Sequence, residues 1–231
     1  AWMKVHFPVE FMTAVLTADS QNTDKIPLYI DECKRLKITI LPPDINESFT
    51  NFTIVNHKNS YKGKAIRFGL SAIKNVKDAS INAIISVRNN GKFKSLYDLF
   101  TRVDNQKVNK RVIESLIQVG AFDLFGKRAA LLSGYEEIRQ KAAQNLAKKA
   151  SGQISIFDSD DNQDNLDAKD KLPEVDDIAE KQLLTWEKQL LGFYLSDNPI
   201  SKQMRLIQDL ISYQLSELDP TIHVGQNVVL G

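Results

Sequence analysis

Two related stretches of sequence decide the fold that we expect for this chain. The first is Ile66-Arg-Phe-Gly-Leu-Ser-Ala-Ile-Lys-Asn-Val-Lys-Asp-Ala-Ser80, which leads into an apolar run ending at Arg88. The second is Val108-Asn-Lys-Arg-Val-Ile-Glu-Ser-Leu-Ile-Gln-Val-Gly-Ala-Phe-Asp-Leu-Phe-Gly-Lys-Arg-Ala-Ala130. Each stretch places apolar residues at helical spacing on both sides of a tight turn. Together they predict a tandem helix-hairpin-helix unit.

Basic residues lie at or beside both turns. The first N–H groups of a helix have no intrahelical partner, and the helix dipole adds partial positive charge, so such turns bind phosphate. Contacts of this kind ignore base sequence and weaken with salt. The sequence therefore predicts that double-stranded DNA contacts the turn residues, which are Lys74, Asn75, Val76, Lys77, Gly120, Gly126, Lys127 and Arg128. A compact helical module that binds protein is the alternative.

The composition limits the kinds of site that the chain can hold. Its single cysteine, Cys33, excludes an intramolecular disulfide and a cysteine-rich zinc site, and the three histidines have no metal-ligand spacing. The net charge of +1 averages a basic part, residues 58–149, and an acidic part, residues 158–180. No apolar run has membrane length and no signal peptide is present, so we expect a cytoplasmic protein without a membrane partner. The chain begins without methionine inside a helical pattern, which predicts a fragment.

The remaining patterns predict a mainly α fold with a small antiparallel β-hairpin, an α+β class. Residues 52–55 and 65–68 are β-like and flank a polar loop that ends in glycine. A helix entered at Pro8 and a second amphipathic helix precede them. Gly120 is expected to end one helix of the second stretch, and an alanine- and lysine-rich helix is expected to continue to Lys149.

An apolar pentapeptide, Gln153-Ile-Ser-Ile-Phe157, lies between the lysine-rich helix and an acidic run rich in Asp and Asn. Two interpretations stay open on the residues alone. An exposed cluster of two isoleucines and a phenylalanine lowers solubility unless a partner covers it, which favours a binding peptide. Alternatively, the peptide folds back onto its own domain. The acidic run 158–170 cannot form a core, and we expect it to be disordered.

Six stretches, in their order along the chain, carry a resemblance to a known family. They are Ala1-Trp-Met-Lys with Pro8-Val-Glu-Phe-Met, Ile40-Leu-Pro-Pro-Asp-Ile-Asn, Phe68-Gly-Leu-Ser-Ala-Ile-Lys-Asn-Val, Val108-Asn-Lys-Arg-Val, Gly120-Ala-Phe-Asp, and Leu191-Gly-Phe-Tyr-Leu-Ser with Asn198-Pro199. The chain resembles the C-family of bacterial replicative DNA polymerases, the polymerase III alpha subunits. Any one stretch alone is unspecific, whereas the set in this order is highly specific.

The resemblance implies a division into five regions. They are the end of a fingers domain (1–50), a tandem helix-hairpin-helix duplex-binding domain (51–150), a clamp-binding peptide with an acidic disordered tether (151–180), a helical connector (181–221), and the truncated first strand of an oligonucleotide-binding (OB) domain (222–231). In the clamp-binding motif Gln153, Ile154, Ser155, Ile156 and Phe157, the glutamine would bond at the edge of a pocket on the sliding clamp, the beta subunit. The last two residues would fill an apolar cleft there.

The resemblance also implies what this chain lacks. The catalytic aspartates of the family lie in a palm domain upstream, so no catalytic residue, metal site or cofactor is expected here. The parent enzyme would extend a primer with divalent metal ions, Mg²⁺, and would work beside other replisome subunits. Two other functions stay open, a freestanding helix-hairpin-helix scaffold of a repair protein and a protein-interaction module.

The chain departs from the family pattern at the first turn. Lys77 stands where the family often has glycine, and Asn75 stands where it sometimes has glycine. The Lys77 side chain either blocks close approach of a phosphate to the backbone or contacts the phosphate itself.

Overall fold

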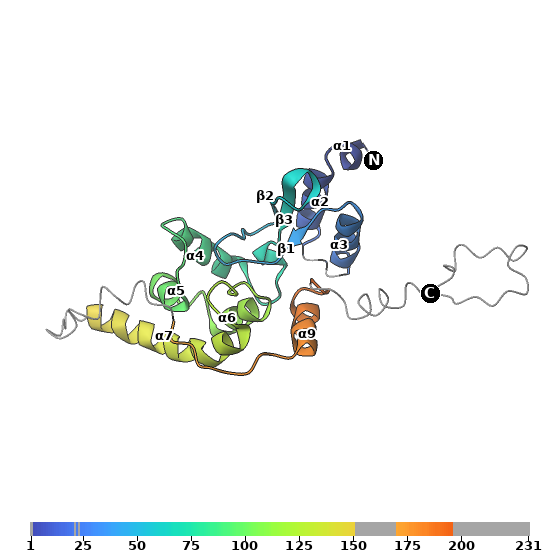
Figure 1. The fold of residues 1–231 in the computed structure, drawn as a ribbon. Coiled ribbons are helices and arrows are strands. Elements are labelled where there is room, and N and C mark those ends of the chain that lie inside the picture. Colours follow the sequence, from blue (N-terminus) through green and yellow to red (C-terminus); the bar gives the residue numbers. More distant parts are fainter. Residues whose placement is uncertain (1, 21, 23, 151–169, 196–231) are drawn as a thin grey trace, which may run out of the picture. The chain divides into compact units, whose positions relative to one another are not determined.

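The computed structural model describes residues 2–20, 22, 24–150 and 170–195. The chain divides into two compact units, residues 1–193 and 194–231, and the description below concerns the first unit. Figure 1 shows its elements in chain order, and their composition confirms the predicted class, mainly α with a small sheet. Within these described residues no helix is long and apolar enough to cross a membrane.

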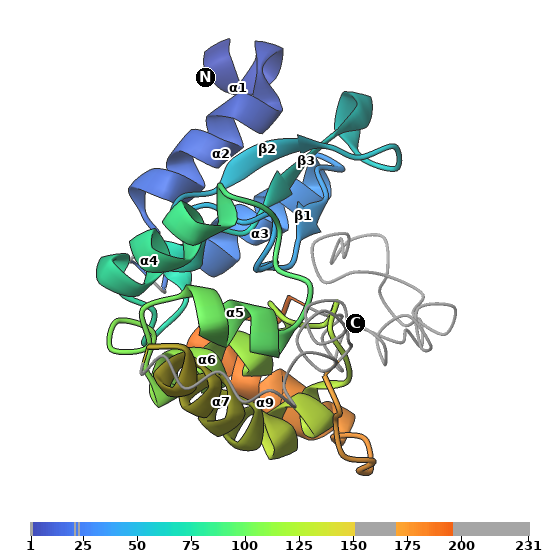
Figure 2. The same cartoon turned by 90° about the vertical axis from the view of Figure 1, so that its left-hand side faces the viewer.

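Three helices open the unit: α1 (Trp2–His6), α2 (Pro8–Ala18) and α3 (Ile26–Arg35). Proline at the first position of α2 suits a helix start, where its missing N–H costs nothing. The α2 face that carries Val9, Met12 and Leu16 is fully buried, as its spacing predicted, and contacts α3 and the sheet. Figure 2 shows α2 and α3 beside β2 and β3.

The sheet has three strands, β1 (Ile40–Leu41), β2 (Thr53–Asn56) and β3 (Lys64–Arg67), in the order β1-β3-β2. The predicted hairpin is confirmed, since β2 and β3 pair antiparallel with Ile54 opposite Ile66. The third strand is an addition: β1 pairs parallel with β3 and places Ile40 opposite Ile66. Ala65 and Ile66 of central β3 are fully buried, and α2 packs against this strand.

In the first stretch, the segment that precedes the turn differs from the prediction. The sequence predicted a helix there, whereas the chain continues from β3 into a short 3-10 helix, η2 (Leu70–Ala72). The physical reason is that β3 is hydrogen-bonded to both neighbouring strands up to Arg67, so too few residues remain for an α-helix. A second 3-10 helix, η1 (Tyr61–Gly63), closes the β-hairpin.

The remaining helices form the hairpin region and its support. They are α4 (Asp78–Arg88), α5 (Leu96–Arg102), α6 (Lys110–Gln118), α7 (Arg128–Ala150) and α9 (Glu180–Leu190). Helix α7 packs on α5 and α6, and α9 packs on α6. Phe122, in the turn of the second stretch, is fully buried and therefore a core residue, and Phe125 is half-buried beside it.

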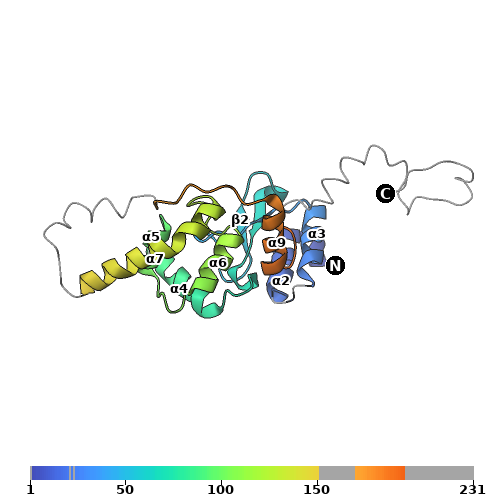
Figure 3. The same cartoon turned by 90° about the horizontal axis from the view of Figure 1, so that it is seen from below.

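Residues 170–179, which we call the strap, differ from the expected disordered tether. They run along α7 to the start of α9, as Figures 1 and 3 both show. The Asp170 carboxylate accepts N–H bonds from Leu96 and Tyr97 at 2.6 and 3.0 Å, in the first turn of α5. Burial raises the pKa of Asp170, against the lowering effect of these two donors. The half-buried Asp170 carboxylate and apolar contacts of Leu172 and Pro173 hold the strap on the protein, although its composition is acidic.

Candidate nucleic-acid interface

The first turn, between η2 and α4, contains one residue in a left-handed conformation. Asn75 has φ = 71°, a region that glycine adopts freely and asparagine tolerates. Its side-chain amide donates to Ser115 Oγ of α6 at 3.1 Å, which ties the turn to that helix. Lys77 has extended backbone, with φ = −96° and ψ = 160°, so its position does not require glycine. Of positions 75 and 77, only position 75 has a backbone conformation that favours glycine.

The two lysines of the first turn point into solvent. Lys74 and Lys77 are exposed, whereas Val76 is buried beneath them. Lys77 is the N-cap residue of α4 and its side chain makes no capping bond, so it stands beside the open N-terminal end of an eleven-residue helix. The N–H of Lys74 is occupied, because it donates to the Leu190 carbonyl of α9 at 3.0 Å. Anion contact at this turn therefore falls to the side chains and to the first turn of α4.

The second turn, between α6 and α7, is organised by Gly120 and Arg128. Gly120 ends α6 with φ = 87°, as predicted from the sequence, and the next N–H, of Ala121, donates back to the Leu116 carbonyl at 2.9 Å. Arg128 makes a two-pronged ion pair with Asp123 and donates to the Gln118 carbonyl at 3.1 Å. Its side chain is only 19% exposed. Arg128 is therefore committed to holding the turn against the end of α6.

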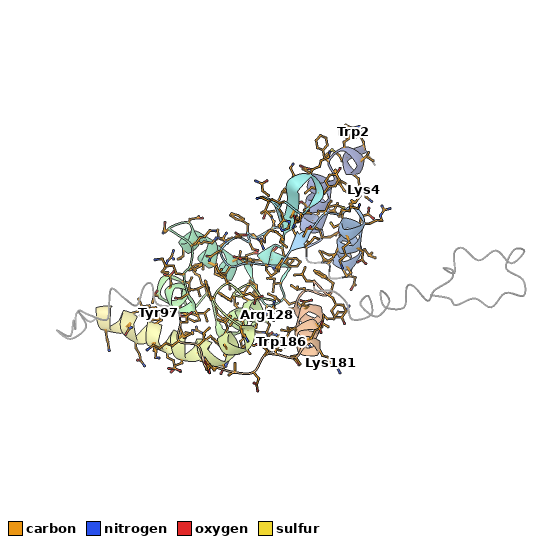
Figure 4. The ribbon with its side chains drawn as sticks, viewed as in Figure 1. Trp2, Lys4, Tyr97, Arg128, Lys181 and Trp186 are labelled. Atoms are coloured by element: carbon orange, nitrogen blue, oxygen red, sulfur yellow. The ribbon has the colours of Figure 1, made fainter. Side chains whose placement is uncertain are left out.

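Lys127 is the accessible cation of the second turn. Its side chain is 70% exposed, and its ammonium lies 3.0 Å from the Asp177 carboxylate of the strap. Gly126, its neighbour, packs closely against the strap, since a Cβ there would lie 2.6 Å from Leu172 Cδ1. A cavity of about 490 Å³ opens between turn, strap and α9, and its lining includes Lys127, Asp177 and Leu183. Figure 4 shows Arg128 at the start of α7 and Trp186 on α9.

Helix α6 joins the two turns. The first turn touches its middle at Ser115, and the second turn begins at its end, at Gln118. The predicted residues thus gather around one helix, although only Lys74, Lys77 and Lys127 present exposed cationic side chains. Sequence reasoning missed Arg111, which is exposed in the first turn of α6. It lies four residues before Ser115, and this spacing places it on the same helix face as the contact with Asn75.

The other predicted residues give no geometry. The clamp-binding motif Gln153–Phe157 lies outside the described residues, as does the predicted strand after residue 222. Among the residues that the structure describes, no group of three His, Cys, Asp or Glu side chains is placed to hold a metal ion.

Comparison with known proteins identifies the relatives of this chain. A family model described as a helix-hairpin-helix motif matches residues 37–131, which include both turns. DNA polymerase III subunit alpha of Vibrio cholerae is 38% identical over 226 residues, which cover 95% of this chain and 19% of that protein. The chain matches one segment of the DNA polymerase III alpha subunits. The corresponding subunits of Escherichia coli and Thermus aquaticus are each 37% identical, and cover 95% and 94% of this chain.

The chain spans about a fifth of the length of the polymerase III alpha subunits that it matches, 17–19% of the three proteins named above. Its similarity extends over nearly all of its own sequence. The identity of the chain to the subunits of all three organisms is 37–38%. The chain is therefore similar to one segment of these subunits, and its residues 37–131 match a helix-hairpin-helix motif.

Proposed function

We propose that this segment holds duplex DNA behind the active site of a DNA polymerase III alpha subunit, without regard to base sequence. The observation that carries the proposal is the placement of exposed lysines on two turns that rest on one helix, α6. Lys77 and Lys127 each precede a helix, where the helix dipole adds to their charge. Two such points suit the regularly spaced phosphates of a duplex, and neither offers a surface for reading bases.

Salt-dependent binding of the 231-residue chain to labelled duplexes of unrelated sequence tests this function. Charge reversal at Lys77 or Lys127 should weaken binding equally on every duplex, because the contacts are to phosphate. Loss that depends on sequence would contradict the assignment. Reversal at Arg128 is a poor test, since it also breaks the Asp123 ion pair and the bond to the end of α6.

We further propose that Gln153–Phe157 docks on the sliding clamp of the same replication machinery. The apolar residues of this peptide and its resemblance to the clamp-binding motif support the proposal. Among the described residues on either side of it, Asn145 of α7 donates to the Tyr97 hydroxyl of α5 at 2.9 Å, and Asp170 accepts from the first turn of α5. Phe157→Ala should cost about 2 kcal/mol or more in binding to purified clamp, as expected for a buried aromatic anchor.

Clamp binding also separates the proposed function from its alternatives. A freestanding repair scaffold would bind duplex DNA but show no clamp affinity that depends on Phe157. A protein-interaction module would show no salt-dependent binding to DNA. In the parent enzyme, which we propose to be a DNA-directed DNA polymerase using divalent metal ions, nucleotide addition belongs to other domains. We expect the chain alone to leave a primed template unextended under conditions where the whole subunit extends it.

A further inference from the structure

The strap is rich in negative charge, although it packs on a turn that is predicted to bind the negatively charged DNA backbone. Residues 170–179 contain four carboxylates and one lysine. Glu174, Asp176 and Asp177 are exposed. The strap is fixed at its first residue, where Asp170 bonds the first turn of α5. It therefore returns to the body of the protein at a defined place, before it reaches the second turn.

Two glycines form the seat of the strap. A Cβ at Gly126 would lie 2.6 Å from Leu172 Cδ1, and a Cβ at Gly134 would lie 3.0 Å from Pro173 Cδ. Neither glycine has a positive φ, so the backbone conformation does not require glycine at these positions. Their small size instead lets the strap lie close to the second turn and α7. This packing brings Asp177 to Lys127, at 3.0 Å.

The contact between Asp177 and Lys127 is exposed and easily broken. The two side chains are 67% and 70% exposed, and ion pairs this open to solvent contribute little net stability. The pocket of about 490 Å³ beside them, lined also by Ile178, shows that the strap does not seal against the turn. A DNA phosphate that approaches Lys127 meets a carboxylate that also carries one negative charge, so the two anions repel each other and compete for the ammonium.

We infer that the strap competes with duplex DNA for the second turn, so that Asp177 and a DNA phosphate occupy Lys127 alternately. The inference rests on the proposed function of that turn. The strap then acts as a built-in electrostatic competitor. The strap lowers the affinity of the second turn for duplex DNA that no other part of the polymerase binds. Where the rest of the polymerase already holds the DNA, the phosphate displaces the strap. The first turn has no carboxylate paired with Lys77 in the described part of the chain, so it remains available throughout.

Duplex affinity in matched variants tests the competition. Asp177→Asn removes the competing charge, and Leu172→Ala loosens the seat without changing charge. Each should tighten binding of the 231-residue chain to a fluorescein-labelled duplex of mixed sequence, by about two- to fivefold for an exposed ion pair. Glu174→Gln, the control, removes an equal charge from the same strap and should change affinity less. In a Lys127→Ala background, Asp177→Asn should have no effect beyond that of Glu174→Gln.

A spin label at Val175→Cys measures strap displacement independently of affinity. In the free chain it should broaden the amide signals around Lys127 and Ala129, and saturating duplex should relieve that broadening. Duplex binding that leaves the broadening unchanged, or equal effects of Asp177→Asn and Glu174→Gln, would overturn the competition while leaving the proposed function intact. Absence of duplex binding in every variant would overturn both, with the broadening still reporting the position of the strap.

Discussion

At the scale of single residues, the second turn depends on the absence of a side chain at Gly120. With φ = 87°, any L-residue there is strained, and a Cβ would lie 2.2 Å from Arg128 Nη2 and 2.7 Å from Asp123 Oδ2. These are atoms of the ion pair that holds the turn to α6. Position 120 is therefore restricted twice, by conformation and by contact.

Gly120→Ala is expected to lower the free energy of unfolding by more than about 1 kcal/mol, the cost of left-handed strain alone, because it also displaces the Arg128–Asp123 pair. Urea denaturation measures this change. Gly63→Ala is the matched control, since Gly63 has φ = 74° and no atom within 4 Å of an added Cβ. Equal losses in the two variants would mean that the ion pair adjusts without cost.

Cys33 shows how burial decides the chemistry of a single side chain. Burial raises the pKa of its thiol from the ordinary 9.0 to about 12. Since the unfolded chain ionises first, the free energy of unfolding should fall as pH rises from about 9 to about 12, by about 1.4 kcal/mol per pH unit from this group. Denaturation at several alkaline pH values, compared with Cys33→Ala, isolates the slope. Both proteins share Tyr29, whose pKa is raised by its hydrogen bond to Asp19, and Tyr135, whose pKa is raised by burial, so these groups cancel in the comparison.

At the scale of elements, residues 44–49 connect parts that lie far apart in sequence. Asn46 exchanges two bonds of 2.8 Å with the backbone of Phe93, and the Ser48 hydroxyl donates to the Phe68 carbonyl. The Ile45 N–H donates to the Ala121 carbonyl in the second turn. This loop therefore fixes β3, the start of α5 and the second turn relative to one another.

Arg88, at the end of α4, donates to the carbonyls of Ile45 and Ser48 at 2.9 and 2.7 Å, and its guanidinium lies 4.9 Å from the Phe49 ring centre. Arg88→Ala leaves two buried carbonyls without a donor, so we expect it to destabilise the fold by about 2–3 kcal/mol. Thermal or urea unfolding measures the loss. Arg111→Ala removes an exposed arginine from a neighbouring helix and should change stability by less than about 0.5 kcal/mol. Similar losses of stability in Arg88→Ala and Arg111→Ala would show that Arg88 does not hold residues 44–49 in place.

The elements differ in how far their sequence predicted them. Helices with regular apolar spacing and clear ends, such as α2 after Pro8 and α6 before Gly120, were predicted because the signals are local. The pairing of β1 with β3 and the bonds of residues 44–49 to distant elements were not, since they join residues twenty or more positions apart. At the candidate site, the prediction from sequence treated Lys127 and Arg128 as equivalent phosphate contacts. Only the structure shows that Asp123 and Gln118 engage Arg128 and leave Lys127 exposed.

At the scale of the whole molecule, the two turns should act on one duplex. Neutralising a lysine that contacts phosphate lowers the slope of log affinity against log salt concentration by about 1. Lys77→Ala and Lys127→Ala should each produce this change, and the double variant should lower the slope by about 2. Lys34→Ala removes one positive charge at an exposed position of α3. It is the control and should leave the slope unaltered. A double variant that loses no more than either single variant would mean that the turns do not share a duplex.

The variants of Lys77 and Lys127 should show equal salt slopes but unequal losses of affinity, because only Lys127 is paired with a carboxylate before DNA binds. Lys77 and Lys127 release the same counterions from DNA, so their slopes should match. The contact of Lys127 must first displace Asp177, which offsets part of its gain. Lys127→Ala should therefore cost less affinity than Lys77→Ala at any given salt concentration, and Asp177→Asn should remove most of that difference. Both quantities are measured by titrations at several salt concentrations of six proteins: the unsubstituted chain, the three single variants, and the two double variants that combine Asp177→Asn with either lysine substitution. Unequal slopes would show instead that the two turns contact different numbers of phosphates.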